Sequence, residues 1–399
     1  MERKPNFLLL GIDGGATKVS GYQVLANDSN LTFDLSSVHA EKSYSEIPGY
    51  LPDFKAVDIP TQLKQRDEHA IQLTEAEKQQ GAVYVEATAI VIEQMVQQTG
   101  INNVLIGLGM PGLKTPDKRG IEVVANGPRI LNYASLLEKR LELANVHLVA
   151  PLHQIGSDAD YCGIGENYAK DGMFRGVDNA YYLGGGTGVA DALKLKGKLV
   201  FFDQIKPWMA KSWEMKADDG RSLERFASAG GIQSIYAEIA GKDVAELNRQ
   251  KIYPLQMASM ALNGDETARK TFDLVVQNLS LLLFERLTTI YAGWQGLFTF
   301  VNPNRPALSK EHEYLGTLLD RIIIGQRLGE LMDSEAGQIV LRQPLLQRLK
   351  DLVASAEALD AAARHHYENP EKLIVTSKLR AAPALGAGID AYLNYQSRK

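Results

Sequence analysis

Cysteine is almost absent from this chain of 399 residues, which contains a single one, Cys162. One cysteine excludes an internal disulfide framework, a cysteine-rich zinc site and an iron–sulfur cluster. Such a low cysteine content is typical of a protein from a reducing compartment, where thiols are not needed as cross-links.

The chain also lacks an excess of positive charge and any long apolar run. Its net charge is −5, so it offers no basic field that could drive nucleic-acid binding. No apolar run reaches the roughly 18 residues of a membrane-spanning helix. The residues MERKP lead into a short apolar strand without a cleavage-site pattern, which argues against a signal peptide. We therefore expect a cytoplasmic protein with no nucleic-acid partner and no membrane partner.

What the chain does contain is an alternation of strands and helices that predicts an α/β fold. Residues 6–25 are predicted to form two strands around a turn, and residues 36–82 a polar, loop-rich insertion. A helix is expected from near Thr74 to Gly100, where glycine suits the residue after a helix end. The length and the ordinary globular composition predict two domains. We place the first at residues 1–171 plus 383–399 and the second at residues 172–382.

Two strand–glycine–strand turns, about 170 residues apart in the sequence, carry more chemistry than a hairpin requires. The first glycine turn is Asp13–Lys18 (DGGATK) and the second is Gly184–Gly188 (GGGTG). Consecutive glycines let main-chain N–H groups converge on an anion, while threonine adds a hydroxyl and lysine a cation. Each turn alone could equally be a tight hairpin with a bulge. The candidate phosphate-binding residues are Gly14, Gly15, Thr17, Lys18, Gly185, Gly186, Thr187 and Gly188.

An aspartate lies between the two turns in the sequence, at the point where an apolar strand ends and a helix begins. Asp158 in the segment GSDADY has the position at which α/β proteins place catalytic groups. Its carboxylate could accept the proton of a hydroxyl that attacks a γ-phosphate. Two alternatives remain open at this stage: Ser157 or Asp158 could serve only as a helix N-cap, and Asp160 could be the base.

The ordered set of motifs resembles the ROK group (repressors, open reading frames and kinases) of the actin-like ATPase superfamily. That group carries D-x-G-G-T-K, then G-x-P-G, N-D-A-N, a glycine turn, an acidic residue before A-S-G, and a glycine-rich adenosine element. This chain offers GIDGGATK, GLGMPG, SDAD, YLGGGTGVADAL, SLERFASAGG, RIIIG and ALGAGIDAY in the same order. The resemblance covers nearly the whole chain. It implies the two-lobed actin-like ATPase (ribonuclease H-like) fold, with mixed sheets flanked by helices around a central cleft.

The resemblance also implies roles for the residues that match the pattern. Asp158 would be the catalytic base, and Asp13 would organise Mg²⁺ through water. ATP would be bound by its phosphates at the two glycine turns and by its adenosine at the segment containing Gly325. A small-molecule sugar would be the substrate, and a homodimer is expected. The implied substrate-binding residues are Asn132, Ser157, Asp158 and Glu224.

The segment between the second glycine turn and Glu224 departs from the family pattern. ROK kinases usually carry there a Glu-x-Gly-His sugar motif and a zinc site of one histidine and three cysteines. Residues 201–224 contain no histidine and no cysteine, so we expect no structural zinc. Trp208, Trp213 and Glu214 occupy this segment instead. The two indoles are either core residues or an aromatic face for a sugar.

The adenosine element departs from the family pattern as well, because Gly325 is followed by Gln326 and Arg327 instead of further glycines.

The leading hypothesis is ATP-dependent phosphorylation of a hydroxyl on a hexose or amino sugar. One alternative is a non-catalytic sensor of the same fold that binds sugar or nucleotide. Another is a superfamily ATPase, or a kinase for a non-sugar substrate. A DNA-binding repressor is disfavoured, because a helix-turn-helix would have to precede the first glycine turn and only seven residues precede the apolar run that begins at Leu8.

Overall fold

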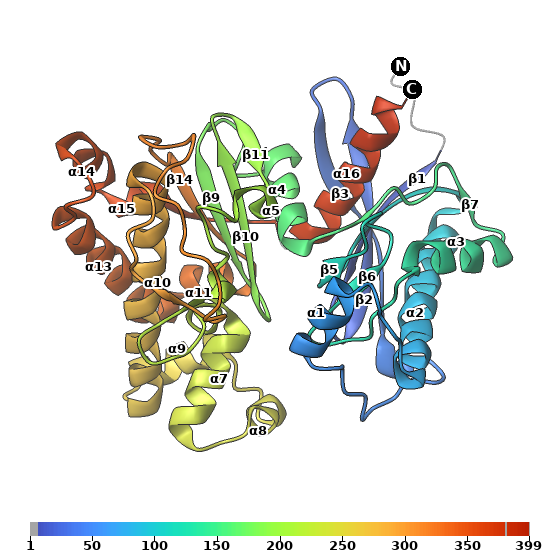
Figure 1. Ribbon diagram of the computed structural model, residues 1–399, viewed down its shortest axis with the longest axis horizontal. Helices are drawn as coiled ribbons and strands as arrows, with labels where there is room; N and C mark the ends of the chain where they lie inside the picture. The colour runs from blue at the N-terminus through green and yellow to red at the C-terminus, as the bar shows by residue number, and fades with distance from the viewer. Residues whose placement is uncertain (1–6, 380, 399) are drawn as a thin grey trace. The chain divides into compact units, whose positions relative to one another are not determined.

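The structure is a computed structural model, which describes residues 7–379 and 381–398. The chain divides into two compact α/β units (Figure 1). Unit 1 comprises Met1–Lys170 and Ala381–Lys399, and unit 2 comprises Asp171–Arg380. Among the described residues, no helix has the length and apolar character required to cross a bilayer.

Unit 1 combines one large mixed sheet, a small two-stranded sheet and helices from both ends of the chain. Its strands are β1 (Leu8–Gly14), β2 (Lys18–Asn27), β3 (Thr32–Ser43), β4 (Asn103–Gly109), β5 (Leu113–Lys114), β6 (Ile121–Val123), β7 (His147–Leu148) and β8 (Ile155–Gly156). Its helices are η1 (Tyr44–Glu46), α1 (Ile59–Asp67), α2 (Glu75–Thr99), α3 (Tyr133–Leu143), α4 (Asp158–Tyr168) and α16 (Ala382–Ser397).

The large sheet of unit 1 has the strand order β3-β2-β1-β4-β7, and β8 also pairs with β4. The β1–β2 and β2–β3 pairs are antiparallel, whereas β4 is parallel to β1, β7 and β8. Side chains alternate between the two faces of a strand. Leu8, Leu10 and Ile12 of β1 belong to the buried core that also includes residues of α2. The other face of β1 and β4 meets α16.

Helix α16 lies unusually close to the sheet because both surfaces are built from small residues (Figure 1, red). A Cβ atom placed on Gly11 of β1 would lie 1.8 Å from the carbonyl oxygen of Ala384, and one on Gly107 of β4 would lie 1.8 Å from that of Ala387. Neither position could hold a side chain without moving the helix. The small residues of the last helix therefore serve its backbone contact with β1 and β4.

The expectation of a loop-rich insertion at residues 36–82 was wrong in its first part. Strand β3 continues to Ser43, and α1 forms within the remainder. As an edge strand, β3 exposes many of its side chains, so its polar sequence hides the alternation that marks a half-buried strand. The helix expected from Thr74 to Gly100 is confirmed: Thr74 and Glu77 form a capping box, and Gly100 has φ +69°.

Unit 2 pairs a five-stranded sheet with a large set of helices. Its strands are β9 (Ala180–Gly185), β10 (Val189–Leu195), β11 (Lys198–Val200), β12 (Met215–Lys216), β13 (Thr299–Phe300), β14 (Arg321–Gly325) and β15 (Ile374–Thr376). Its helices are α5 (Phe202–Ile205), η2 (Ser212–Glu214), α6 (Glu224–Ala227), α7 (Ala229–Ala240), α8 (Val244–Arg249), α9 (Pro254–Leu262), α10 (Glu266–Ala292), α11 (Gln326–Asp333), α12 (Glu335–Gly337), η3 (Gln338–Arg342), α13 (Gln343–Ala354), α14 (Ala361–Tyr367) and α15 (Pro370–Leu373).

The main sheet of unit 2 repeats the topology of unit 1. Its order is β11-β10-β9-β14-β15, with β9 antiparallel to β10 and parallel to β14, and β14 parallel to β15. The same order and directions hold for β3-β2-β1-β4-β7 in unit 1. Each unit thus places a glycine turn between its two central antiparallel strands. That turn lies at the carboxyl end of the first strand, which is the edge where α/β proteins bind ligands.

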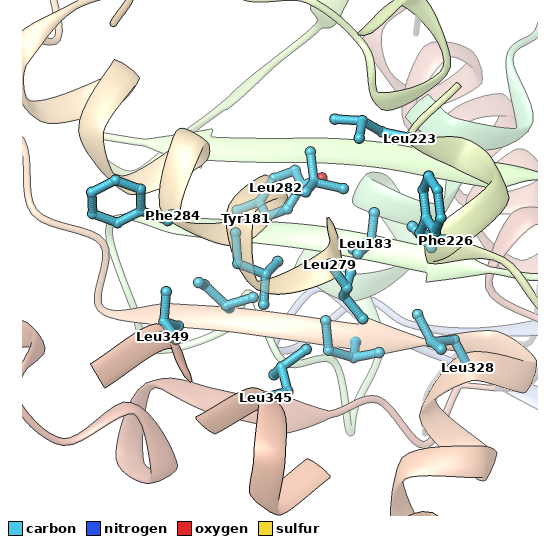
Figure 2. Close-up of a cluster of buried hydrophobic side chains, with 14 of the residues drawn as sticks. Tyr181, Leu183, Leu223, Phe226, Leu279, Leu282, Phe284, Leu328, Leu345 and Leu349 are labelled. Carbon is cyan, nitrogen blue, oxygen red and sulfur yellow. The ribbon is translucent and has the colours of Figure 1, made fainter. Parts of the chain in front are cut away.

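The core of unit 2 holds its sheet against α10 and α13. Tyr181 and Leu183 of β9 pack with Leu279 and Leu282 of α10, and the cluster continues to Leu345 and Leu349 of α13 (Figure 2). All of these side chains are fully buried or almost so. Burying a leucine side chain stabilises the fold by about 1.5–3 kcal/mol. This packing fixes the strand that carries the second glycine turn.

Candidate active site

The first glycine turn closes the hairpin between β1 and β2. The amide of Gly15 donates to the carbonyl of Lys18 at 2.9 Å. That amide is therefore used within the hairpin. The Lys18 ammonium forms an ion pair with Glu41 on β3 at 2.6 Å. Both side chains are exposed, and exposed pairs of this kind are weak, so an anion could compete for the lysine.

Two stacked tyrosines hold the tip of the first glycine turn in place. The hydroxyl of Tyr84, on α2, donates to the carbonyl of Ala16 at 3.0 Å, and the amide of Tyr44 donates to the carbonyl of Thr17 at 3.0 Å. The two rings stack at a centroid distance of 3.7 Å. These anchors leave no mark in the sequence, because Tyr84 is 68 residues from Ala16 and looks like an ordinary member of an apolar helix face.

Strand pairing brings Asp13 and Asp158 to the same edge of the sheet. Asp13 on β1 is in register with Gly109 on β4, and Gly109 is in register with Gly156 on β8. Because these strands are parallel, their carboxyl ends meet. Asp158 follows β8 by two residues and begins α4. The structure therefore places the predicted base beside the residue predicted to organise a metal ion.

Asp158 is not the N-cap residue of α4, so the capping alternative does not account for it. Ser157 is the N-cap residue of α4, but its side chain makes no capping hydrogen bond. Asp158 is the first residue inside the helix, and its Oδ1 atom accepts a hydrogen bond from the neighbouring amide of Ala159 at 3.0 Å. Asp158 as a residue is partly exposed. The helix start thus orients the group and leaves part of it open to solvent or a ligand.

Burial and the neighbouring carboxylate of Asp158 raise the pKa of Asp13 to about 7, with the Lys18 ammonium opposing the shift. A buried carboxyl group resists ionisation because its charged form loses hydration, and a second negative charge adds to this cost. Asp13 therefore changes its charge close to neutral pH.

We expect Asp13→Asn to make the ligand-free protein more stable at pH 8 than the unmodified chain. The raised pKa means that the folded state holds a proton that the unfolded state releases between about pH 4 and pH 7. The free energy of unfolding should therefore fall across this range as pH rises, by up to about 4 kcal/mol. Asparagine removes this slope, so the two proteins should differ little near pH 4. Urea unfolding at pH 4, 6 and 8 measures the effect.

A matched control is Asp53→Asn, which replaces an exposed aspartate of the same unit. This variant should keep the pH slope of the unmodified chain. An unchanged slope in Asp13→Asn would show that Asp13 ionises without cost in the folded protein.

The loop that carries Asp158 is tied to α16 through one carboxylate. The Oδ2 atom of Asp390 lies 3.1 Å from Nε2 of His153, accepts from Nε2 of Gln154 at 2.8 Å, and accepts from the hydroxyl of Tyr161 at 3.3 Å. These partners lie on both sides of Asp158 in the sequence. Asp390 could not be predicted from the sequence, because it is more than 200 residues away from these partners. Asp390 thus holds the chain on both sides of Asp158.

The second glycine turn is closed by its own backbone and by Glu224. The amide of Gly186 donates to the carbonyl of Gly188 at 2.9 Å. The next amide along the strand, that of Val189, donates to Oε1 of Glu224 at 3.0 Å. A Cβ atom on Gly188 would lie 2.5 Å from the same Glu224 oxygen. Glu224, predicted to contact a sugar, thus uses one of its carboxylate oxygens to hold this turn.

The residues after Gly325 reach the second glycine turn from the neighbouring strand. Gly325 pairs in register with Gly184, so the end of β14 lies beside the start of the turn. Gln326 has φ +58°, the left-handed region that non-glycine residues rarely occupy. The next residue, Arg327, donates from Nη2 to the Oγ1 atom of Thr187 at 2.8 Å. The sequence shows the departure from the glycine pattern at Gln326 and Arg327, but it does not indicate this contact with Thr187.

Asn132, Trp208 and Trp213 are not among the residues described above that contact the two glycine turns. Asn132 is exposed at the start of α3. Within the described chain, its side chain forms no hydrogen bond with Asp13 or Asp158. Trp208 is buried and stacks on His312 at a centroid distance of 4.0 Å, which makes it a core residue. Trp213 is 48% exposed.

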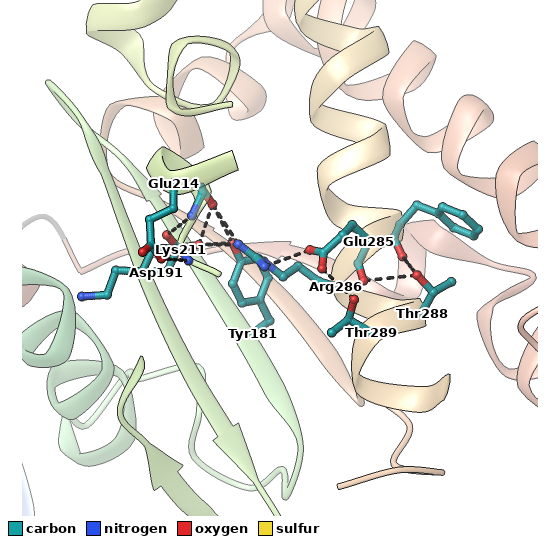
Figure 3. Close-up of polar contacts among 10 residues, drawn as sticks. Tyr181, Asp191, Lys211, Glu214, Glu285, Arg286, Thr288 and Thr289 are labelled. Atoms are coloured by element: carbon teal, nitrogen blue, oxygen red, sulfur yellow. Dashed lines mark hydrogen bonds and ion pairs between the residues drawn. The ribbon is translucent and has the colours of Figure 1, made fainter. Parts of the chain in front are cut away.

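The segment from the second turn to Glu224 is held by buried charges. Arg286 on α10 is fully buried and pairs with Glu285 at 2.8 Å and with Asp191 of β10 at 3.3 Å (Figure 3). Asp191 also accepts from the amide of Ser212 at 2.9 Å and from the hydroxyl of Tyr181 at 2.5 Å. Burial raises the pKa of the Glu285 carboxyl, and Arg286 opposes that shift. These contacts fix η2 against the central strands.

The carboxylates of unit 1 are suitable for a magnesium ion. No group of three or more histidine, cysteine, aspartate or glutamate side chains that could hold an ion occurs among the residues the structure describes. Mg²⁺, however, usually takes only one or two carboxylates and fills its shell with water and phosphate oxygens. Asp13 could supply such a carboxylate, with the Asp158 carboxylate close enough to influence its pKa. A cation would also relieve the repulsion that contributes to the raised pKa of Asp13.

Comparison with known proteins identifies the fold. No family model and no curated protein matches the sequence. Among solved structures, a ROK family glucokinase from Streptomyces griseus in complex with glucose and AMPPNP is 14% identical, with a TM-score of 0.54. The alignment covers 96% of this chain and 98% of that one.

Two further structures agree with this result. The ROK hexokinase from Thermus thermophilus is 15% identical, with a TM-score of 0.53 over 98% of this chain and 100% of that one. A ROK family transcriptional regulator, described as a homologue of the E. coli MLC protein, is 12% identical, with a TM-score of 0.53 over 97% of this chain and 79% of that one. The chain therefore has the actin-like ATPase fold of the ROK sugar kinases, as the motifs predicted.

Proposed function

We propose that the protein is an ATP- and Mg²⁺-dependent kinase that phosphorylates a hydroxyl group of a hexose or amino sugar. The main support for the proposal is the position of Asp13 and Asp158. Both carboxylates lie at the carboxyl edge of the sheet of unit 1, beside the first glycine turn. The fold is consistent with it, because the Streptomyces griseus structure contains glucose and an ATP analogue.

Asp158 is proposed as the general base. In phosphoryl transfer the protein mainly positions the reactants and stabilises charge, and a carboxylate orients the attacking hydroxyl. The Asp158 carboxylate would accept the hydroxyl proton as the sugar oxygen bonds to the γ-phosphorus and the bond to the β-phosphate breaks. ADP leaves with the electron pair of that bond. Ser157, Asn132 and Glu224 are proposed to contact the sugar.

Asp13 would hold Mg²⁺ through water, and the ion would neutralise charge on the phosphates. Lys18 and the amides near Thr17 are proposed to bind phosphate oxygens at the first glycine turn. Gly185–Gly188 are proposed to do so at the second. Since the amides of Gly15 and Gly186 are already used within their hairpins, the remaining amides and the threonine hydroxyls would supply these contacts. Gly325 is proposed to lie beside the adenosine.

A non-catalytic sensor is the second candidate, and one observation favours it. The Gln326 side chain lies against the second glycine turn: a Cβ atom on Gly186 would be 2.3 Å from its Oε1 atom. A glutamine there narrows a surface that glycines would leave open. The regulator among the structures of the same fold shows that the fold is not confined to enzymes.

The experiment that separates the two candidates is ADP release against a panel of hexoses and amino sugars, with and without Mg²⁺. A kinase should release ADP only when both a suitable sugar and Mg²⁺ are present. A sensor should show a sugar-dependent rise in thermal stability without turnover. ADP release that is the same with and without every sugar would count against the kinase and indicate an ATPase.

A further inference from the structure

We infer that Arg327 binds the phosphate chain of the phosphoryl donor at the second glycine turn. This inference deepens the proposed function, because it names a residue and a ligand chemistry for the donor side of the same site. Nothing in the family pattern supplies it, since that pattern has glycines where this chain has Gln326 and Arg327.

The geometry places two side chains of the β14–α11 junction over the second glycine turn. Arg327 contacts the Thr187 hydroxyl at 2.8 Å, which fixes its guanidinium at the tip of the turn. The amide of Gln326 lies beside the glycines, since Cβ atoms on Gly184 and Gly186 would approach it to 3.1 and 2.3 Å. A ligand at this turn therefore meets a guanidinium and a side-chain amide in addition to backbone N–H groups.

The charge of Arg327 is available to a ligand. Its side chain is exposed, and its hydrogen bond to Thr187 is with a neutral hydroxyl. In the part of the chain that the structure describes, no carboxylate lies within ion-pair distance of its guanidinium. Guanidinium groups bind phosphate through paired hydrogen bonds and stay charged at every relevant pH. An unpaired guanidinium on a glycine turn is thus well suited to a chain of phosphates.

Glu224 makes this charge more important. Its carboxylate is bound to the amide of Val189 on the same turn. A carboxylate at this turn works against the binding of phosphate, and the Arg327 guanidinium supplies positive charge at the same turn. Removing the arginine should therefore weaken phosphate binding more than the loss of one hydrogen bond would.

The test is calorimetric titration of the full chain with inorganic tripolyphosphate, with ATP and with adenosine. In Arg327→Gln we expect the Kd for tripolyphosphate and for ATP to rise by the same factor, about 10- to 100-fold. The Kd for adenosine should not change. Arg327→Lys keeps the positive charge but loses the two-pronged guanidinium. Its Kd for tripolyphosphate should therefore lie between those of the unmodified chain and Arg327→Gln. Arg348→Gln, which removes an exposed arginine of α13, is the matched control and should bind like the unmodified chain.

Any one of three results would overturn the inference. The first two are an unchanged Kd for tripolyphosphate in Arg327→Gln and no binding of tripolyphosphate to the unmodified chain at millimolar concentration. A loss of adenosine affinity equal to the loss for tripolyphosphate would also do so. The proposed function can fail separately. If no sugar is phosphorylated but tripolyphosphate binding depends on Arg327, the kinase is wrong and this inference stands. If the unmodified chain and Arg327→Gln both phosphorylate sugar with the same KM for ATP, the kinase stands and this inference is wrong.

Discussion

Asp158→Asn should lower kcat for sugar phosphorylation by about 10²- to 10⁴-fold, the range typical of a lost general base. Asparagine has the same shape but cannot accept the hydroxyl proton. The Kd for ATP should change little, because Asp158 is proposed to act on the sugar hydroxyl and only indirectly on the nucleotide. The measurements are steady-state kinetics with saturating sugar and calorimetric titration with ATP.

Asp160→Asn provides the control, because Asp160 lies two residues further along the same helix and was the other candidate base. Strand pairing and the raised pKa of Asp13 favour Asp158 over Asp160. If Asp160→Asn lost as much activity as Asp158→Asn, the assignment of the base would be wrong. Equal losses of ATP affinity and kcat in Asp158→Asn would assign that residue to nucleotide binding instead.

Arg286→Met should lower the free energy of unfolding of the protein by about 3–5 kcal/mol. The substitution leaves the carboxylates of Asp191 and Glu285 buried without their cation. Buried charges cost little when paired and a great deal when one partner is removed. Because Asp191 also holds Ser212 and Tyr181, the loss should loosen the segment that leads to Glu224. Urea unfolding followed by circular dichroism measures the change.

Arg221→Met is the matched comparison for this stability effect. Arg221 also pairs with two carboxylates, Asp219 and Glu238, but all three side chains are partly exposed. Surface pairs contribute about 0–1 kcal/mol, so its loss should be small. Similar decreases in the free energy of unfolding for Arg221→Met and Arg286→Met would show that the buried ion pairs contribute no more to stability than the surface pairs.

Local signals in the sequence predicted much of the fold. The glycine turns stand between strands as expected, and the helix from Thr74 to Gly100 begins and ends at its capping residues. Such features depend on residues three or four positions apart, which can be read directly from the sequence. The structure also explains why the last helix is rich in small residues, because its backbone contacts β1 and β4 directly.

Contacts between distant segments were beyond sequence reasoning. Arg327 and Thr187 are 140 residues apart, and Arg286 and Asp191 are 95 apart. A single arginine carries no mark that separates a buried ion pair from a solvated surface residue, because only the packed fold decides which groups lose water. The strand β3 was missed for a related reason. It lies at the edge of the sheet, where many of its side chains are exposed and polar, so the alternation typical of a strand is not visible in the sequence.

The most direct test is mass analysis of the products after incubation with ATP, Mg²⁺ and each sugar in turn. We expect one sugar to gain a single phosphoryl group in stoichiometric balance with ADP. Asp158→Asn, with ATP binding intact, should form almost none of that product. ADP without any phosphorylated sugar, or the same yield of sugar phosphate from Asp158→Asn, would contradict a kinase that uses this carboxylate as its base.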